Sequence, residues 1–160
     1  MKISVFDDHD HARCIACSIE TAEARAASEG LRLTPTRRRV LEILLEEHRA
    51  LGAYDILERL NAEGKRAQPP TAYRALEFLT RAGLAHRVER LNGYVACTAP
   101  ESPHAPVFMI CRKCRAVAEA ASDAAGAAIA ATADAVDFSL EACVIEVEGL
   151  CGECARQGAV

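Results

Sequence analysis

Apolar positions follow a helical period through the first half of the chain, and this pattern predicts four helices. The first covers 18–30. The second begins after Thr34, an N-cap residue that is followed by Pro35 at the first helical position. The third covers 53–64 and the fourth 69–83. The fourth helix has its apolar residues on one face, at Ala72, Ala75, Leu76, Leu79 and Ala82.

Two short runs of alternating polar and apolar residues follow the fourth helix, at 84–91 and 93–99. The dipeptide Asn92-Gly93 between them is a strong signal for a β-hairpin. Helices that are followed by such a hairpin predict a winged helix-turn-helix.

The second half of the chain has a different pattern. Three prolines within the nine residues 98–106 indicate a linker, and beyond it we predict strands and one Ala-rich helix. The predicted elements are strand 107–110, strand 116–119, helix 122–135 and strand 138–148. The fold class is therefore α+β, with a winged-helix domain followed by a small α/β domain. The predicted boundaries are a mobile tail at 1–17, the winged helix at 18–98, a linker at 99–106 and the second domain at 107–160.

Composition favours a globular protein. Of the 160 residues, 51% are hydrophobic, which is enough for a buried core, and no run approaches the roughly 18 apolar residues of a membrane span. The first residues are acidic and His-rich, unlike a secretory signal. We therefore expect a cytoplasmic protein with no membrane partner, in which cysteine pairs bind metal or do redox chemistry more often than they form lasting disulfides.

The charge is unevenly distributed. The chain has a net charge of −4, made up of −3 over 1–30, +4 over 31–100 and −5 over 101–160. The basic middle part is able to face phosphates, while the acidic ends help solubility.

Two Cys-x-x-Cys pairs carry the strongest chemical signal. They are Cys111 with Cys114 and Cys151 with Cys154, each at the end of a predicted strand. Four thiolates form the closed tetrahedral set of a structural zinc site, which would stabilise a small domain. A rubredoxin-like iron site uses the same ligands, and redox couples or unrelated buried thiols are further alternatives.

Four other residues form a second candidate set of ligands, namely His86, Cys97, His104 and Glu119. Each one alone is more typical of an ordinary surface or core residue. Together they gain weight because His86 and Cys97 lie on paired strands of one hairpin. One cysteine, two histidines and a carboxylate suit zinc, and the thiolate argues against manganese or magnesium.

The fourth helix also carries candidate contacts to DNA on its exposed side. Arg74 is suited to the two major-groove acceptors of guanine, and Tyr73 beside it to a thymine methyl group or a phosphate. Thr71, in the first turn of the same helix, is a further candidate contact. Arg37, within the run 36–39, is a candidate phosphate contact at the start of the second helix, although charge runs more often only solvate a helix. Tyr54 is a candidate for DNA contact or for packing.

Residues 9–17 form a third group of possible ligands, with His9, His11, Cys14 and Cys17. We interpret this stretch as a mobile tail rather than as a further metal site.

An enzyme is disfavoured by what surrounds the cysteine pairs. A zinc deaminase needs a His-x-Glu and a proline before its Cys-x-x-Cys, whereas Ile110 and Leu150 precede the pairs here and no His-x-Glu exists. We therefore expect no catalytic residue and no small-molecule substrate. A thiol redox or electron-transfer protein remains the alternative from another class.

Several motifs together resemble the ferric uptake regulator family of bacterial metalloregulators. They are LRLTPTRRRVLEIL, GAYDIL, PPTAYRALEFL, ICRKC and GLCGEC, in that order from about residue 20 to 155. The stretch from Ala67 to Cys97 is most similar to the zinc-uptake-regulator branch. Iron-sensing members carry a His- and Asp-rich cluster before the first Cys pair, where this chain has only His104.

This resemblance implies a homodimer held by its C-terminal domains, with one winged helix per subunit. It implies two zinc ions per subunit, a structural one at the two Cys pairs and a regulatory one at His86, Cys97, His104 and Glu119. It also places Tyr54, Tyr73 and Arg74 at the DNA. The implied function is zinc-dependent repression of zinc-uptake genes, with a family member that senses another metal or peroxide as the alternative.

Overall fold

The computed structural model describes residues 11–100 and 105–158, and these form two compact units. The N-terminal unit contains residues 11–100 and the C-terminal unit residues 105–158. The boundary between the two units falls within the linker predicted at 99–106. No helix within the described residues is both long and apolar enough to cross a membrane.

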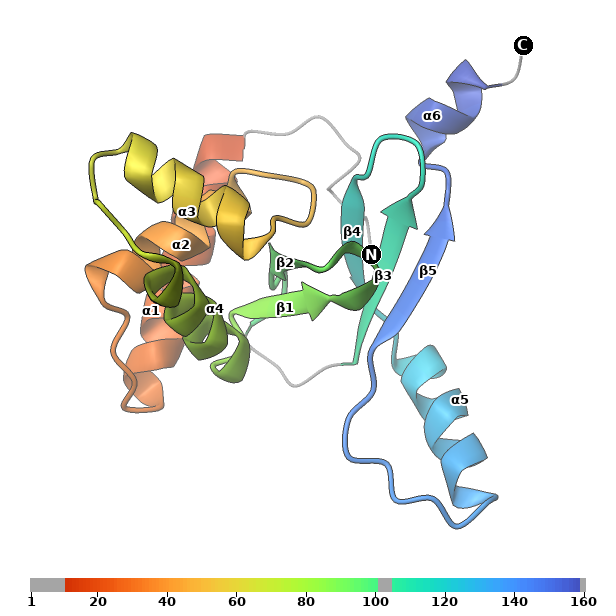
Figure 1. The fold of residues 1–160 in the computed structure, drawn as a ribbon. Helices are drawn as coiled ribbons and strands as arrows, with labels where there is room; N and C mark the ends of the chain where they lie inside the picture. The colour runs from red at the N-terminus through yellow and green to blue at the C-terminus, as the bar shows by residue number, and fades with distance from the viewer. Residues whose placement is uncertain (1–10, 101–104, 159–160) are drawn as a thin grey trace. The chain divides into compact units, whose positions relative to one another are not determined.

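The N-terminal unit is a winged helix (Figure 1). Its elements in chain order are α1 (His11–Ser28), α2 (Pro35–Leu45), α3 (Ala53–Ala62), α4 (Pro69–Arg81), β1 (Ala85–Val88), the 3-10 helix η2 (Glu89–Leu91) and β2 (Gly93–Ala96). Strands β1 and β2 form a two-stranded antiparallel sheet, with Ala85 opposite Ala96.

The predicted signals for helices α2 to α4 are confirmed. Thr34 is the N-cap of α2, where its side chain accepts a hydrogen bond from the Arg37 N–H, and Pro35 follows at the first helical position. Gly64, the predicted stop after α3, adopts a positive φ of 80°. The predicted inner face of α4 is buried in full, at Ala72, Ala75, Leu76, Leu79 and Ala82. One core therefore joins these helices.

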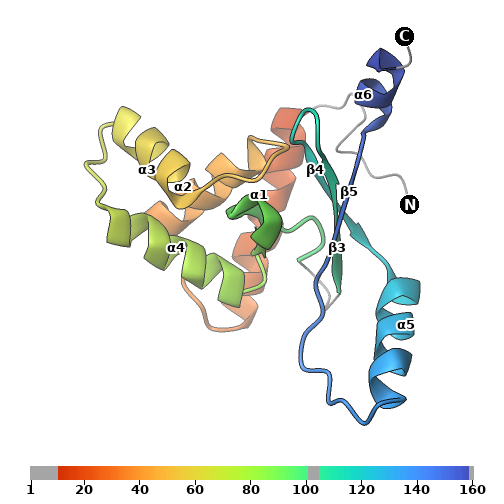
Figure 2. The same ribbon diagram turned by 45° about the vertical axis from the view of Figure 1, so that its right-hand side comes forward.

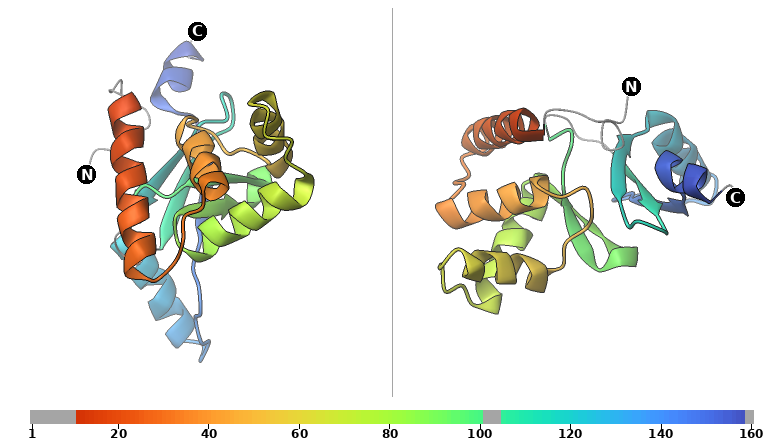
Figure 3. Two further views of the ribbon diagram at one scale, coloured as in Figure 1. Left: turned by 90° about the vertical axis from the view of Figure 1, so that its left-hand side faces the viewer. Right: turned by 90° about the horizontal axis from the view of Figure 1, so that it is seen from above.

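Helix α1 begins earlier than the sequence pattern predicted. It starts at His11 rather than at residue 18, so residues 11–17 are helical and the predicted tail at 1–17 is too long. No proline or glycine interrupts this stretch, and the apolar spacing of Ile15, Ile19, Ala22 and Ala26 continues through it. This stripe packs α1 onto the core beside α2 (Figure 3).

The turn of the wing also differs from the prediction of a tight Asn92-Gly93 turn. Four residues connect the strands, because Val88 pairs with Gly93 and η2 lies between them. Asn92 adopts the left-handed conformation, with φ 46°. Gly93 belongs to β2, where an added Cβ would lie 3.0 Å from the Cβ of Ala50 and 3.2 Å from the backbone of Leu51. Glycine is required there by close packing.

A network of ion pairs joins the surfaces of α1, α2 and α3. Arg39 contacts three carboxylates, those of Glu42, Glu46 and Glu63. Arg38 pairs with Glu23 on α1 and with Glu42. Two arginines of the run 36–39, which was predicted to contact phosphates, are therefore paired with carboxylates within the unit.

Replacing Arg39 with glutamine tests this network. Exposed pairs contribute about 0.2–1 kcal/mol each, so the loss of three should lower the free energy of unfolding by about 1–2 kcal/mol. Urea unfolding followed by circular dichroism at 222 nm measures it. Arg49→Gln is the control, because the Arg49 side chain is 57% exposed and pairs with Glu47. That change should cost less than about 0.5 kcal/mol.

The same comparison has a predicted pH dependence. The hydrogen bond from Arg39 lowers the pKa of Glu63, and the one from Arg59 lowers the pKa of Glu47. Such carboxylates stabilise the fold above their unfolded pKa of about 4.3, and this contribution is lost as pH falls through the lowered folded pKa. The difference between the wild type and Arg39→Gln should therefore shrink below about pH 4. A difference that persists at pH 3 would argue against the ion pairs as its cause.

The C-terminal unit contains a three-stranded sheet with two helices (Figure 2). Its elements are β3 (Pro106–Cys111), β4 (Val117–Ala121), α5 (Asp123–Asp134), β5 (Ile145–Gly149) and α6 (Gly152–Gln157). Strand β3 is central, antiparallel to β4 and parallel to β5. The α+β class, with a winged helix and a small α/β unit, is confirmed.

The long strand predicted at 138–148 is wrong in its first half. Only β5 pairs with β3, and its pairing begins at Ile145 opposite Val107. Asp137 has a positive φ of 54°, and residues 138–144 pair with no strand in the part of the chain that the structure describes. Alternation predicted a strand there, but a strand also needs a neighbour to complete its hydrogen bonds. Cys143, predicted to be buried in that strand, lies before β5 and is half-buried.

Candidate metal centres and nucleic-acid interface

Parallel pairing of β3 with β5 brings the two Cys-x-x-Cys pairs together in the C-terminal unit. Cys111, the last residue of β3, lies opposite Gly149, the last residue of β5. Cys114 follows in the turn to β4, and Cys151 is the N-cap of α6. Because parallel strands end on the same side of a sheet, residues 40 positions apart become neighbours.

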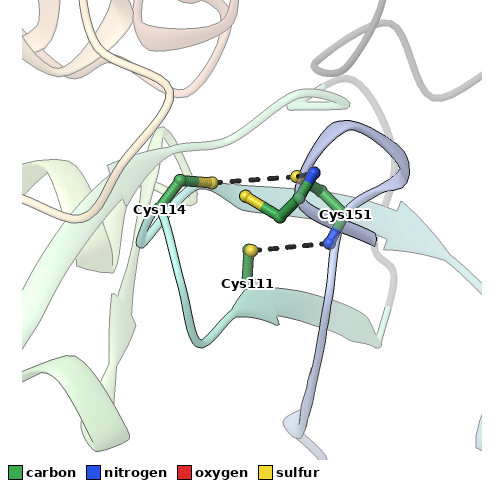
Figure 4. Close-up of side chains that lie close together, drawn as sticks. Cys111, Cys114 and Cys151 are labelled. Carbon is green, nitrogen blue, oxygen red and sulfur yellow. Dashed lines mark hydrogen bonds between the residues drawn. The ribbon is translucent and has the colours of Figure 1, made fainter. Parts of the chain in front are cut away.

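The four sulfurs of Cys111, Cys114, Cys151 and Cys154, which we call the cysteine cluster, all lie within 4.8 Å of one another. The Sγ atoms of Cys114 and Cys151 are 3.8 Å apart (Figure 4). A tetrahedral zinc ion with Zn–S bonds of about 2.3 Å would set its sulfurs about 3.8 Å apart. The donor set and its spacing therefore fit a closed tetrahedral metal site.

Backbone hydrogen bonds favour the thiolate form at one side of the cysteine cluster. The Cys151 N–H donates to Sγ of Cys111 at 3.4 Å, as Figure 4 shows, and Cys154 N–H donates to Sγ of Cys151 at 3.5 Å. Backbone N–H groups of Cys114 and Cys151 lower the pKa of Cys111 to about 6. Burial, and then the neighbouring sulfurs, raise the pKa of Cys154 to about 12. Four adjacent thiolates need a bound cation to be stable together.

The wing hairpin of the N-terminal unit carries a second pair of donors. His86 lies in β1 opposite Val95, and Cys97, directly after β2, comes two residues after Val95, so His86 and Cys97 are diagonal neighbours on one face. Their ligand atoms lie within 4.8 Å of each other. Cys97 is buried, and its N–H donates to the Leu84 carbonyl oxygen at 3.0 Å, which holds it in line with β1. We call His86 and Cys97 the hairpin pair.

The other two predicted ligands of the regulatory site are not on this hairpin. Glu119 lies in β4 of the C-terminal unit, opposite Phe108, and is 7% exposed. A carboxylate that is this strongly buried is uncommon in a core, which makes it a good candidate for a ligand. His104 lies outside the described residues.

Most predicted DNA contacts are accessible on the N-terminal unit. Tyr73 is 48% exposed, and Arg74 beside it is also exposed. Thr71, in the first turn of α4, is half-buried, and its N–H donates to the Gln68 carbonyl oxygen. Tyr54, in the first turn of α3, is 69% exposed, so it is not the packing residue of the alternative reading. Arg37 is half-buried and contacts Phe78 of α4.

Comparison with known proteins now identifies the family. The model of the ferric uptake regulator family matches residues 28–148. The zinc uptake regulation protein of Escherichia coli (strain K12) is 39% identical over 134 residues, which cover 83% of this chain and 78% of that protein. The chain belongs to the ferric uptake regulator family.

Solved structures of members of this family are similar over nearly the whole chain. A zinc uptake regulator complexed with zinc and DNA has a TM-score of 0.86 at 36% identity, covering 91% of this chain and 98% of that one. Holo XcZur has a TM-score of 0.80 at 34% identity, covering 86% and 96%. The resemblance noted from the motifs is thus confirmed, including its zinc-uptake-regulator branch.

The possible ligands at residues 9–17 lie outside the stretch 28–148 that matches the family. His9 lies outside the described residues, and the side chains of His11 and Cys14 are not described either. Their backbone belongs to α1 from His11 onward, and Cys17 is exposed.

The sequence pattern did not predict the contact that Phe78 of α4 makes with Arg37. Phe78 lies among the apolar positions of that helix, but it is half-buried and its ring is covered by Arg37. The available signal for this contact was Arg37 in the first turn of α2, because an arginine side chain stacks well on aromatic rings. Only the folded arrangement of α2 and α4 shows which ring it meets.

Proposed function

We propose that this protein is a zinc-dependent repressor that binds DNA and controls zinc-uptake genes. The observation that carries the proposal is its likeness, over 91% of its length, to a zinc uptake regulator complexed with zinc and DNA. The donors of this chain agree with that likeness, since both candidate centres contain thiolates, which favour zinc over manganese or magnesium. A protein that acts on DNA in this way would work in the cytoplasm.

Two zinc ions per subunit would have different roles. The cysteine cluster offers four thiolates within one unit, a closed and tight set that would stay filled and stabilise the fold. The regulatory ion would take the hairpin pair from one unit, Glu119 from the other and His104 from the linker. Because this second set is mixed and drawn from separate parts of the chain, it would bind more weakly and report the zinc concentration.

The regulatory ion would act by restricting the DNA-binding unit. Without it, the linker would let each winged helix sample many orientations, and few of these suit a two-fold operator. Zinc and DNA would then favour each other by the same coupling free energy. Such couplings are typically about 1–3 kcal/mol, a factor of about 5–150 in affinity.

A second copy of this chain would supply the other half of the DNA-binding surface. The C-terminal unit exposes large apolar side chains that a soluble monomer would bury, namely Val136, Phe138, Leu140, Val144, Val147 and Leu150. Association through these side chains would make a homodimer and place two α4 helices on one duplex. Half-sites about one DNA turn apart would match that symmetry.

The test is selection of a duplex from random sequence by the full-length protein, followed by gel-shift titration. Zinc should promote selection of a two-fold site, whereas a chelator should abolish it and iron(II) or manganese should replace zinc poorly. Selection that depends on iron(II) would favour another metal-sensing member of the family. Visible absorbance of the purified protein would reveal iron in the cysteine cluster, because zinc is colourless.

A further inference from the structure

Arg37 links α2 to the helix that carries the predicted base contacts. Its guanidinium carbon lies 3.6 Å from the centroid of the Phe78 ring in α4. Nη1 of Arg37 donates a hydrogen bond to the Arg32 carbonyl oxygen at 2.8 Å, and its backbone N–H donates to the Thr34 hydroxyl at 3.4 Å. The side chain is thus held at the start of α2 while its planar head covers the ring. We call this contact the arginine stack.

The arginine stack lies on the side of α4 that also carries Arg74. Phe78 follows Arg74 by four residues, which places the two one turn apart on the same face of the helix. The opposite face of α4 packs through small and branched apolar residues such as Ala72 and Leu76, which are buried. Apolar packing is non-directional, whereas an arginine over an aromatic ring has a defined geometry. The stack therefore limits how α4 rotates beneath Arg74.

The Arg37 guanidinium already has two partners within the unit. One face of the guanidinium is covered by Phe78, and Nη1 is used by the Arg32 carbonyl. The next two residues are occupied as well, since Arg38 pairs with Glu23 and Glu42, and Arg39 has three carboxylate partners. The three-arginine run is therefore used to assemble the unit.

We propose that Arg37 is a positioning residue for sequence-specific DNA recognition, acting through Phe78 to fix the orientation of α4. This inference rests on the proposed function and replaces a phosphate contact as the role of Arg37. A positioning residue affects only complexes in which base contacts are made, so it should govern specificity. A phosphate contact instead weakens binding to all sequences and contributes about 1 to the salt slope.

The experiment uses the zinc-loaded full-length protein, the selected duplex and a scrambled duplex of the same length and composition. Kd is measured for both at several salt concentrations. Arg37→Met should weaken binding to the selected duplex by about 3- to 30-fold, the range of a stacked cation on an aromatic ring. Binding to the scrambled duplex and the salt slope should stay unchanged. Phe78→Leu should give the same loss, and the double variant should lose no more than either single one.

Two further variants make the result decisive. Arg38→Met removes one positive charge next to Arg37 but leaves the arginine stack in place. It should leave the ratio of the affinities for the selected and the scrambled duplex unchanged. Arg37→Lys keeps the charge and loses the planar stack and the hydrogen bond to Arg32. Arg37→Lys should lower the ratio of the affinity for the selected duplex to that for the scrambled duplex. It replaces Arg37→Met in the experiment if circular dichroism shows that Arg37→Met does not fold.

Three results would overturn the inference. They are an equal loss on both duplexes with a smaller salt slope, a Phe78→Leu variant that binds like the wild type, and a lowered melting temperature with an unchanged affinity ratio. Failure to select any duplex with zinc would refute the proposed function and this inference with it. Normal selection that Arg37→Met leaves unaltered would refute the inference alone.

Discussion

Replacing Cys154 with serine should remove one zinc ion per chain and unfold the C-terminal unit. Cys154 is 5% exposed, and its sulfur lies within 4.8 Å of the other three sulfurs of the cysteine cluster. In structural zinc sites the metal contributes about 10–16 kcal/mol of apparent binding free energy that is coupled to folding. A three-stranded sheet with few buried large side chains has little else to replace it. We expect loss of the dimer as well.

Zinc content by mass spectrometry, thermal unfolding by circular dichroism and mass by light scattering measure these effects. Cys143→Ser is the matched control, because Cys143 lies in the same unit, is half-buried, and belongs to neither metal-ligand group among the described residues. It should keep the wild-type zinc content and melting temperature. If Cys154→Ser remained a folded dimer with all its zinc, the cysteine cluster would not be the structural site.

Replacing Cys97 with serine should have the opposite profile, a folded dimer that no longer responds to zinc. Cys97 follows the wing strand β2, and its backbone N–H bonds to Leu84 whatever the side chain. Serine therefore preserves the hairpin while it removes the soft ligand. The variant should retain one zinc ion per chain and bind the selected duplex equally with and without added zinc. The lost enhancement should be about 5- to 150-fold.

A gel shift under chelator control measures this response, with Cys17→Ser as a control for loss of an exposed thiol in the same unit. The decisive comparison is with Cys154→Ser. If the Cys97 variant unfolds in the same way and the Cys154 variant keeps a zinc-insensitive fold, the structural and regulatory roles are reversed.

Local signals in the sequence predicted the elements whose causes are local. The cap at Thr34, the stop at Gly64 and the apolar stripe of α4 depend on neighbours within a few residues, and each was located correctly. The two Cys-x-x-Cys pairs were also recognisable, because the spacing within each pair is a property of a single turn. The structure adds that parallel strands bring these pairs together.

Features that depend on distant partners were predicted less well. Residues 138–144 alternate like a strand, but pairing with β3 begins only at Ile145. In the wing, the backbone of Leu51 pairs with Tyr94 and lies so close to residue 93 that only glycine fits there, a contact that the local sequence does not show. Arg38 and Arg39 looked free to meet phosphates because sequence alone does not show that Glu23 of α1 and Glu63, the C-cap of α3, face them.

The pairing of β3 with β5 also sets an order of events during synthesis. All residues of the winged helix have been translated before Cys151 exists, so that unit is able to fold while the second one still lacks its parallel strand and half of its sulfurs. In a nascent chain stalled before Cys151, the N-terminal unit should therefore resist proteolysis, whereas the incomplete C-terminal unit should be cleaved. Metal capture would then be a late step in making the protein, and zinc starvation would be felt first by newly made chains.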